Sequence, residues 1–176
     1  MEREADDQDL LDLLRLTMVP GVGPHTLGAL LAHFKSAGRA LAASRAALRD
    51  VAGIGPKLAE SIALAVQQID AQAELDLCRQ HAVRVLAQHD PEYPPLLKDI
   101  PDPPSLLYVK GRLDPRDQLA IAIVGSRRST PYGERTAERL ASALARTGFT
   151  VVSGLARGID AAAHRAALKA GGRSIA

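Results

Sequence analysis

Two glycine-bearing segments in the last third of the chain combine residue types that bind phosphate. Residues 125–131 read Gly-Ser-Arg-Arg-Ser-Thr-Pro, and residues 153–160 read Ser-Gly-Leu-Ala-Arg-Gly-Ile-Asp. Arginine forms charge-assisted hydrogen bonds to phosphate, hydroxyl groups donate further ones, and glycine lets another backbone approach closely. Pro131 suits the first position of a helix and Thr130 its N-cap, so N–H groups and the positive end of the helix dipole would face the ligand. Both segments therefore predict phosphate binding.

We expect this binding from residues that supply backbone N–H, hydroxyl or guanidinium groups. The first segment contributes Gly125, Ser126, Arg127, Arg128 and Thr130, and the second contributes Ser153, Gly154, Ala156, Arg157, Gly158 and Asp160. The carboxylate of Asp160 would repel a phosphate but would also cap the following helix, and we favour the capping role. His164 lies four residues further on the same helical face, which predicts a hydrogen bond to Asp160 in preference to a catalytic dyad.

Positive charge is concentrated in the same part of the chain. Residues 1–70 carry 7 basic and 9 acidic side chains, residues 71–117 carry 6 and 8, and residues 118–176 carry 9 and 3. Clustered rather than total charge determines affinity for nucleic acid. Aromatic residues make up only 3% of the chain, so base stacking cannot dominate. The composition predicts binding through phosphates, with little sequence preference and a strong dependence on salt.

Other chemistries lack their residue patterns here. Neither segment contains the Gly-x-Gly-x-x-Gly dinucleotide fingerprint or a P-loop, and no spacing of His, Cys and carboxylates indicates a metal, so we predict no cofactor, metal or catalytic residue. The alternative function is a Rossmann-like enzyme that binds or hydrolyses nucleotide phosphates, with Asp160 and His164 as acid and base. The longest apolar run, residues 119–124, is too short to cross a membrane, and the acidic N-terminus is unlike a signal peptide.

Both segments follow predicted strands and precede predicted helices. Strands are expected at 106–110, 119–124 and 149–153 and from Arg173, with helices at 131–147 and 160–170. Continuous apolar strands are typical of parallel sheets covered on both faces, so we predict a Rossmann-like, doubly wound α/β domain with both segments at the carboxyl edge of neighbouring strands. Such a sheet usually has further strands, so we expect it to be incomplete at the C-terminus and the chain to be a partial sequence.

The N-terminal region is an internal duplication. Residues 10–18 and 26–34 have helical leucine spacing around a Gly21-Val-Gly-Pro turn, and the same arrangement recurs 32 residues later around Gly53-Ile-Gly-Pro. This all-α region resembles paired helix-hairpin-helix motifs and sterile-alpha-motif (SAM-like) domains. Its turns expose N–H groups that could hold phosphate, while its net charge of −2 favours simple packing of a bundle. A protein-docking role is a third interpretation.

The middle of the chain connects these two regions. A helix starting at Lys57 is predicted to run on to about Gln80, with a domain boundary near residue 70, so that the domains are 1–70 and 71–176. A short strand is expected at 83–86. Six prolines between Asp90 and Ser105 predict an ordered, irregular loop with one helical turn near 96–99, anchored by Tyr93, Leu96, Leu97 and Ile100.

The combined motifs resemble the DNA-processing protein A (DprA/Smf) family. The resemblance is carried by Gly125-Ser-Arg with Thr130-x-Tyr-Gly133, and by Ser153-Gly-Leu-Ala-Arg-Gly-Ile-Asp160-x-x-Ala-His164. It extends upstream through Asp90-Pro-Glu-Tyr-Pro-Pro-Leu-Leu-Lys-Asp-Ile100 and Asp102-Pro-Pro-Ser-Leu-Leu-Tyr-Val-Lys-Gly111.

The resemblance implies a cytoplasmic, non-enzymatic protein of natural transformation. Members of the family bind single-stranded DNA, protect it and help to load the recombinase RecA. By resemblance, the two loops would hold the DNA backbone through Gly125, Ser126, Arg127, Thr130, Ser153, Gly154, Gly158 and Asp160. The family forms homodimers, and both dimerisation and RecA contact are associated with the later part of the Rossmann-like domain, beyond the residues of this chain.

Overall fold

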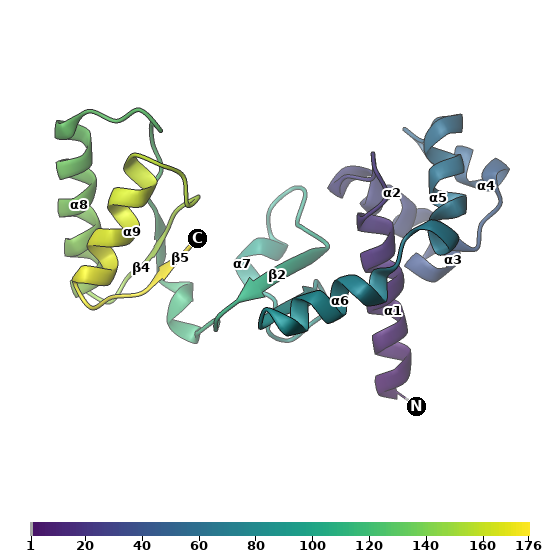
Figure 1. Ribbon diagram of the computed structural model, residues 1–176, viewed down its shortest axis with the longest axis horizontal. Helices are drawn as coiled ribbons and strands as arrows, with labels where there is room; N and C mark the ends of the chain where they lie inside the picture. The colour runs from purple at the N-terminus through teal and green to yellow at the C-terminus, as the bar shows by residue number, and fades with distance from the viewer. Residues whose placement is uncertain (1) are drawn as a thin grey trace. The chain divides into compact units, whose positions relative to one another are not determined.

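The fold is described by a computed structural model covering residues 2–176 (Figure 1). Its contacts divide the chain into two compact units, one ending at Arg112 and one beginning at Leu113. Each unit is described by itself. None of the helices within residues 2–176 is long and apolar enough to span a membrane.

The first unit is mainly helical. Its elements, in chain order, are α1 (Glu2–Thr17), α2 (Pro24–Phe34), α3 (Ala37–Leu41), α4 (Arg45–Arg49), α5 (Pro56–Gln68), α6 (Ala71–Gln80), β1 (Val83–Ala87), α7 (Pro95–Lys98) and β2 (Leu106–Lys110). The two predicted helix–turn–helix arrangements are therefore confirmed, as α1–α2 and α4–α5. The short helix α3 lies between them, and the side chain of its N-cap, Ser36, accepts a hydrogen bond from the N–H of Arg39.

The two hairpin turns have the same backbone geometry. Gly21 and Gly53 have φ of 95° and 85°, a left-handed conformation that glycine adopts without strain. Gly23 and Gly55 are extended N-caps, each followed by a proline at the start of the next helix. This equivalence supports the internal duplication at the level of structure as well as sequence.

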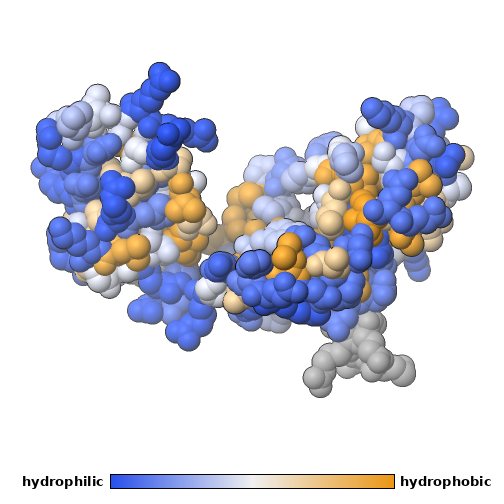
Figure 2. Space-filling view, in the orientation of Figure 1, coloured by the Kyte–Doolittle hydropathy of each residue, from blue (hydrophilic) through white to orange (hydrophobic). Residues whose placement is uncertain are grey.

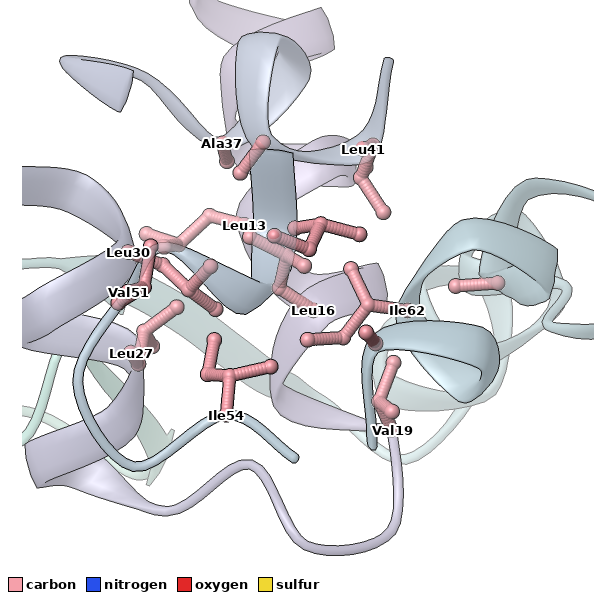
Figure 3. Packing of buried hydrophobic residues seen from close by; sticks show 14 of the residues in the cluster. Leu13, Leu16, Val19, Leu27, Leu30, Ala37, Leu41, Val51, Ile54 and Ile62 are labelled. Carbon is pink, nitrogen blue, oxygen red and sulfur yellow. The ribbon is translucent and has the colours of Figure 1, made fainter. Parts of the chain in front are cut away.

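Apolar side chains from α1 to α5 form one core. Leu16, Leu30, Leu48 and Ile62 are completely buried, and Figure 3 shows Leu16, Ile54 and Ile62 directed toward a common centre. Burial of a leucine or isoleucine contributes about 1.5–3 kcal/mol relative to leaving it exposed. The two hairpin turns therefore connect helices of one packed bundle, and this packing fixes the positions at which α2 and α5 begin.

The predicted continuous helix from Lys57 to Gln80 is wrong, because the chain breaks it at Ile69 and Asp70. Ile69 is extended, and the Asp70 side chain caps α6 by accepting a hydrogen bond from the N–H of Ala73 at 3.0 Å. A side-chain cap of this kind favours a new helix start over continuation. The helix α6 then packs against α1 through Leu14, Ala71 and Leu75.

The two strands that follow α6 form an antiparallel hairpin within the first unit. Val83 pairs with Lys110 and Ala87 with Leu106, and Leu106 also packs against the helical core. The contacts thus group residues 71–112 with the helices. The domain boundary near residue 70, with domains 1–70 and 71–176, remains a prediction from the sequence, and the first compact unit extends further, to Arg112.

The proline-rich segment contains the expected helical turn, α7. Tyr93 is buried, and its hydroxyl donates a hydrogen bond to the carbonyl of Pro104 at 2.7 Å, which ties the two ends of the segment together. Burial also raises the pKa of Tyr93. Leu96 and Ile100 are exposed, so the prediction that they anchor the loop is wrong, and Tyr93 fulfils that role.

The second unit is a parallel β-α-β-α-β fold, as predicted. It consists of the 3₁₀ helix η1 (Pro115–Gln118), β3 (Ala120–Ala122), α8 (Pro131–Arg146), β4 (Thr150–Val152), α9 (Ile159–Lys169) and β5 (Ser174–Ile175). The strand order is β3-β4-β5, and both pairings are parallel. Ala141, Ala145, Val151, Ala163 and Ala167 pack between the helices and the sheet.

The strand β3 departs from the expected burial. Ala120 and Ala122 are exposed within the described chain, and Ile121 between them is half-buried. The strand is therefore not covered on both of its faces by the described residues. Small alanines on the helices bring α8 and α9 close to each other and to β4. The helices thereby fix the positions of the loops that precede them.

A half-buried ion pair between Asp117 and Arg173 joins the segments that precede β3 and β5. Asp117 accepts two hydrogen bonds from the Arg173 guanidinium, both 2.7 Å, and a third at 2.9 Å from the hydroxyl of Thr150. Burial alone would raise the pKa of Asp117, but these bonds and the N–H of Asp114 hold it below its usual range. This clamp connects the segment before β3 with the residue before β5.

Candidate nucleic-acid interface

The two predicted phosphate-binding loops lie against each other at the carboxyl ends of β3 and β4. A Cβ added at Gly158 would collide with the carbonyl oxygen of Ser126, and one added at Gly125 would lie 2.7 Å from the Ile159 side chain. Gly158 also has φ of 81°. Both glycines are therefore required for contact between the loops, which places the side chains of both segments on one continuous surface.

Asp160 is the residue that fastens the loops together. One carboxylate oxygen accepts from the N–H of Gly125 at 3.3 Å, and the other accepts from Gly154 and Ala156 at 3.1 and 3.4 Å. The side chain is buried. These backbone groups, predicted to face phosphate, are thus already occupied by a carboxylate of the protein itself.

The predicted N-cap role of Asp160 is therefore wrong in its geometry. Gly158 is the N-cap of α9, and Asp160 lies within the first turn. Its carboxylate accepts N–H groups of the loops and none from the helix it belongs to.

The hydroxyl groups of the two loops also have partners within the chain. Ser153 donates to the carbonyl of Ile123 at 2.6 Å, and Ser129 donates to Glu134 at 2.6 Å. Ser126 is bonded to the backbone of Arg128 at 3.0 and 3.1 Å. Thr130 caps α8 as predicted, accepting from the N–H of Gly133 at 3.1 Å. These side chains shape the loops, and their exposed members can still accept or donate a second bond.

The guanidinium groups are the free charges of this surface. Arg127, Arg128 and Arg157 are exposed, and within residues 2–176 none of them forms an ion pair. Hydrophilic side chains project where the chain passes from β3 to α8, at the top of the second unit (Figures 1 and 2). The loops also lead into the N-termini of α8 and α9, whose helix dipoles add positive partial charge to this region.

His164 does not pair with Asp160. Its Nδ1 lies 2.7 Å from the hydroxyl oxygen of Ser174, and that hydroxyl donates to the carbonyl of Val151 at 2.9 Å. The ring therefore donates through Nδ1, and its buried Nε2 has no partner among the described residues. Both interpretations of an Asp160–His164 interaction, hydrogen bond and catalytic dyad, are wrong, and the acid–base arrangement of the alternative enzyme is not formed.

Two residues of this surface were missed by sequence reasoning. Leu155 has φ of 54° and is 72% exposed, and Tyr132 is 73% exposed at the start of α8. For Leu155 the available signal of exposure was its position inside the glycine-rich loop. For Tyr132 the available signal was its place directly after Pro131, on the first turn of the helix.

Comparison with protein families identifies both parts of the chain. The family "DNA recombination-mediator protein A" matches residues 84–176, and the family "SAM-like Helix-hairpin-helix tandem" matches residues 13–68. The first match covers more than half of the chain and contains both loops. The second contains both glycine turns.

Individual relatives agree with these matches. Protein Smf of Synechocystis sp. is 41% identical over 167 residues, covering 93% of this chain and 42% of that protein. The DNA processing protein DprA of Bacillus subtilis is 39% identical over 98 residues, covering 55% of this chain and 33% of that protein. The chain thus spans less than half the length of these curated relatives.

A solved structure shares the fold. The X-ray structure of DNA processing protein A (DprA) from Streptococcus pneumoniae superposes with a TM-score of 0.70 at 30% identity, covering 95% of this chain and 56% of that one. Sequence motifs, two abutting loops and overall fold therefore agree, and the chain belongs to the DprA/Smf family, described as DNA recombination-mediator protein A.

Proposed function

We propose that this chain binds single-stranded DNA through its phosphate backbone, without reading sequence, and takes part in natural transformation. The observation that carries the proposal is the set of three exposed guanidinium groups, Arg127, Arg128 and Arg157, on two loops in direct contact. Arginine matches phosphate geometry and stays charged at any physiological pH. Residues 118–176 carry a net charge of +6, which attracts polyanions to this unit.

The loops supply a rigid base for these arginines. Asp160 fixes the backbone on both sides of the contact, and the hydroxyl of Thr130 fixes the start of α8. A pre-organised surface loses less conformational entropy when it binds. Contacts to phosphate oxygens position a nucleic acid and do not distinguish bases, which is consistent with binding that is independent of sequence.

Membership of the family adds a cellular role to the proposed DNA binding. By membership of the family, the protein would act in the cytoplasm, protect incoming DNA and assist loading of RecA, and it would assemble as a homodimer. No catalytic step is required for this role. Family membership and the DNA-processing names of the relatives support it.

Titration of labelled single-stranded and double-stranded oligonucleotides tests the proposal. Arg127→Ala is expected to weaken single-strand binding by about 1–3 kcal/mol, because it removes a charge-assisted hydrogen bond. Arg146→Ala is the matched control, since Arg146 is also exposed but lies in the last turn of α8. Equal losses in both variants would indicate diffuse attraction to charge and would contradict a site at the loops.

A further inference from the structure

Leu155 has an unusual conformation for its residue type. It lies in the left-handed region, with φ of 54°, and exposes 72% of its surface. Leucine rarely adopts this conformation, because its Cβ approaches the following carbonyl oxygen. Exposure of the side chain brings no packing within the chain that would offset the strain. Strained residues of this kind cluster at functional sites.

The carboxylate of Asp160 fixes the backbone on both sides of Leu155. It holds the N–H groups of Gly154 and Ala156, the two residues that flank Leu155. With both neighbours fixed, Leu155 is held between them and its side chain projects from the loop. The same interaction that fastens the two loops together therefore presents an apolar side chain to the outside.

Tyr132 presents a second apolar group on the same surface. It is 73% exposed on the first turn of α8, and its ring makes no aromatic or cation–π contact within the described part of the chain. Gly133, next to it, approaches Ile159 of the second loop, since an added Cβ would lie 3.4 Å from the Ile159 side chain. Tyr132 is thus adjacent in sequence to a residue that contacts the second loop.

Exposed apolar groups and cations occur together in this part of the chain. Tyr132, at the start of α8, follows Arg127 and Arg128 of the first loop, and Leu155 precedes Arg157 on the second. A single-stranded nucleic acid offers the complementary pattern, because its phosphates are charged and its unstacked bases are apolar on their faces. In a duplex the base faces are stacked inside and cannot reach an external ring.

We propose that Tyr132 and Leu155 contact the faces of unstacked bases while the loop arginines hold the phosphates. This inference rests on the proposed function and gives it a source of strand preference. Tyr132 would act as a stacking platform, and Leu155 would pack against the edge or face of a neighbouring base. Neither contact distinguishes one base from another, so binding stays independent of sequence.

The test compares oligonucleotides that differ only in their bases. Fluorescence anisotropy is measured at one salt concentration with an ordinary single strand, an abasic strand of equal length and a duplex. Tyr132→Ala is expected to weaken binding to the ordinary strand about tenfold, as loss of one stacked base would, and to leave the abasic strand and the duplex unchanged. Tyr132→Phe retains the ring and should retain the affinity.

Two further variants address Leu155. Leu155→Asn keeps a residue that tolerates the left-handed region and removes the apolar side chain, so it should weaken only ordinary single-strand binding. Leu168→Ala removes another exposed leucine, in α9, and should change nothing. Thermal midpoints of all variants are measured alongside. Those of Tyr132→Ala, Tyr132→Phe and Leu168→Ala are expected to equal that of the wild type because these side chains are exposed, whereas Leu155→Asn should raise the midpoint slightly by relieving backbone strain.

The outcomes separate this inference from the proposed function. If Arg127→Ala weakens binding but Tyr132→Ala does not, base contact is overturned and backbone binding stands. Equal loss by Tyr132→Ala on ordinary and abasic strands also overturns base contact, since the ring would then act through the loop. A wild-type chain without affinity for single strands overturns both proposals.

Discussion

At the scale of single residues, Asp160 has the largest predicted effect on the site. Asp160→Ala leaves three N–H groups of the two loops without their carboxylate and should destabilise the second unit by about 3 kcal/mol. The change removes a negative charge, but DNA affinity is expected to fall because the two loops lose the hydrogen-bond acceptor that holds them together. Amide hydrogen exchange of residues 113–176 and an oligonucleotide titration measure the two effects.

Asp160→Asn provides the control for this prediction. The amide keeps one acceptor oxygen and the size of the side chain, so stability should lie between those of the wild type and Asp160→Ala. Both variants remove the same negative charge. If both bound DNA more tightly than the wild type, electrostatic repulsion by Asp160 would outweigh its positioning role, and the prediction would be wrong.

The residue types of the site were predictable, but their partners were not. Glycine, arginine and a Thr130-Pro131 helix start are local signals, and the structure confirms the cap by Thr130. The bond from Ser153 to Ile123 joins residues 30 positions apart, and Asp160 joins positions 35 apart. Such bonds depend on how β3 and β4 are aligned, which no local pattern specifies.

At the scale of elements, the two hairpin turns allow a matched comparison of glycines. Gly53 has φ of 85°, whereas Gly55 has an ordinary φ of −82°, and an added Cβ at either position meets nothing within 4 Å. Gly53→Ala should therefore destabilise the first unit by about 1–2 kcal/mol through backbone strain alone. Gly55→Ala should cost less, about 0.5 kcal/mol, because it only replaces glycine by alanine at an N-cap. Urea unfolding of both variants measures the difference.

Equal effects in the two variants would contradict this explanation of the turn.

The helices around the turns were predictable from leucine spacing and from the Gly-x-Gly-Pro sequence. The break between α5 and α6 was also signalled, since Asp70 is a common N-cap residue, but the apolar spacing on both sides concealed it. The N-cap signal of Asp70 was thus present in the sequence, but the continuous apolar spacing led to the prediction of one unbroken helix.

The clamp between Asp117 and Arg173 predicts a pH dependence of the second unit. Because the pKa of Asp117 is lowered in the folded state, its contribution to stability is complete above the usual aspartate pKa of about 3.9. That contribution is lost as the pH falls through the lower, folded-state pKa. Asp117→Asn should therefore be less stable than the wild type at pH 7 and approach it in acid.

Hydrogen exchange of residues 113–176 at neutral pH and near pH 3 checks this prediction. Arg173→Gln is the complementary variant, because without the cation the pKa of Asp117 is no longer held down. This variant should be less stable than the wild type at pH 7, and its stability should depend less on acid. A constant stability difference between wild type and Asp117→Asn across this range would show that the pair does not titrate with folding.

At the scale of the whole molecule, contacts and family matches divide the chain differently. The compact units meet between Arg112 and Leu113, whereas the family matches end at residue 68 and begin at residue 84. Sequence reasoning followed the change of pattern near residue 70. It could not show that Leu75 and Leu106 pack against α1, because that contact joins segments far apart in the chain.

The charge of the whole molecule leads to a quantitative test of where DNA binds. Each phosphate neutralised on a single strand changes the slope of log K against log salt by about −0.7. Three loop arginines then predict a slope of about −2, whereas engagement of all 9 basic residues of 118–176 predicts about −6. Arg127→Ala should reduce the magnitude by about 0.7, and Arg146→Ala should leave it unchanged. Because the slope counts phosphates independently of overall affinity, a wild-type value near −6 would assign binding to the general charge of the unit, and a value near −2 assigns it to the two loops.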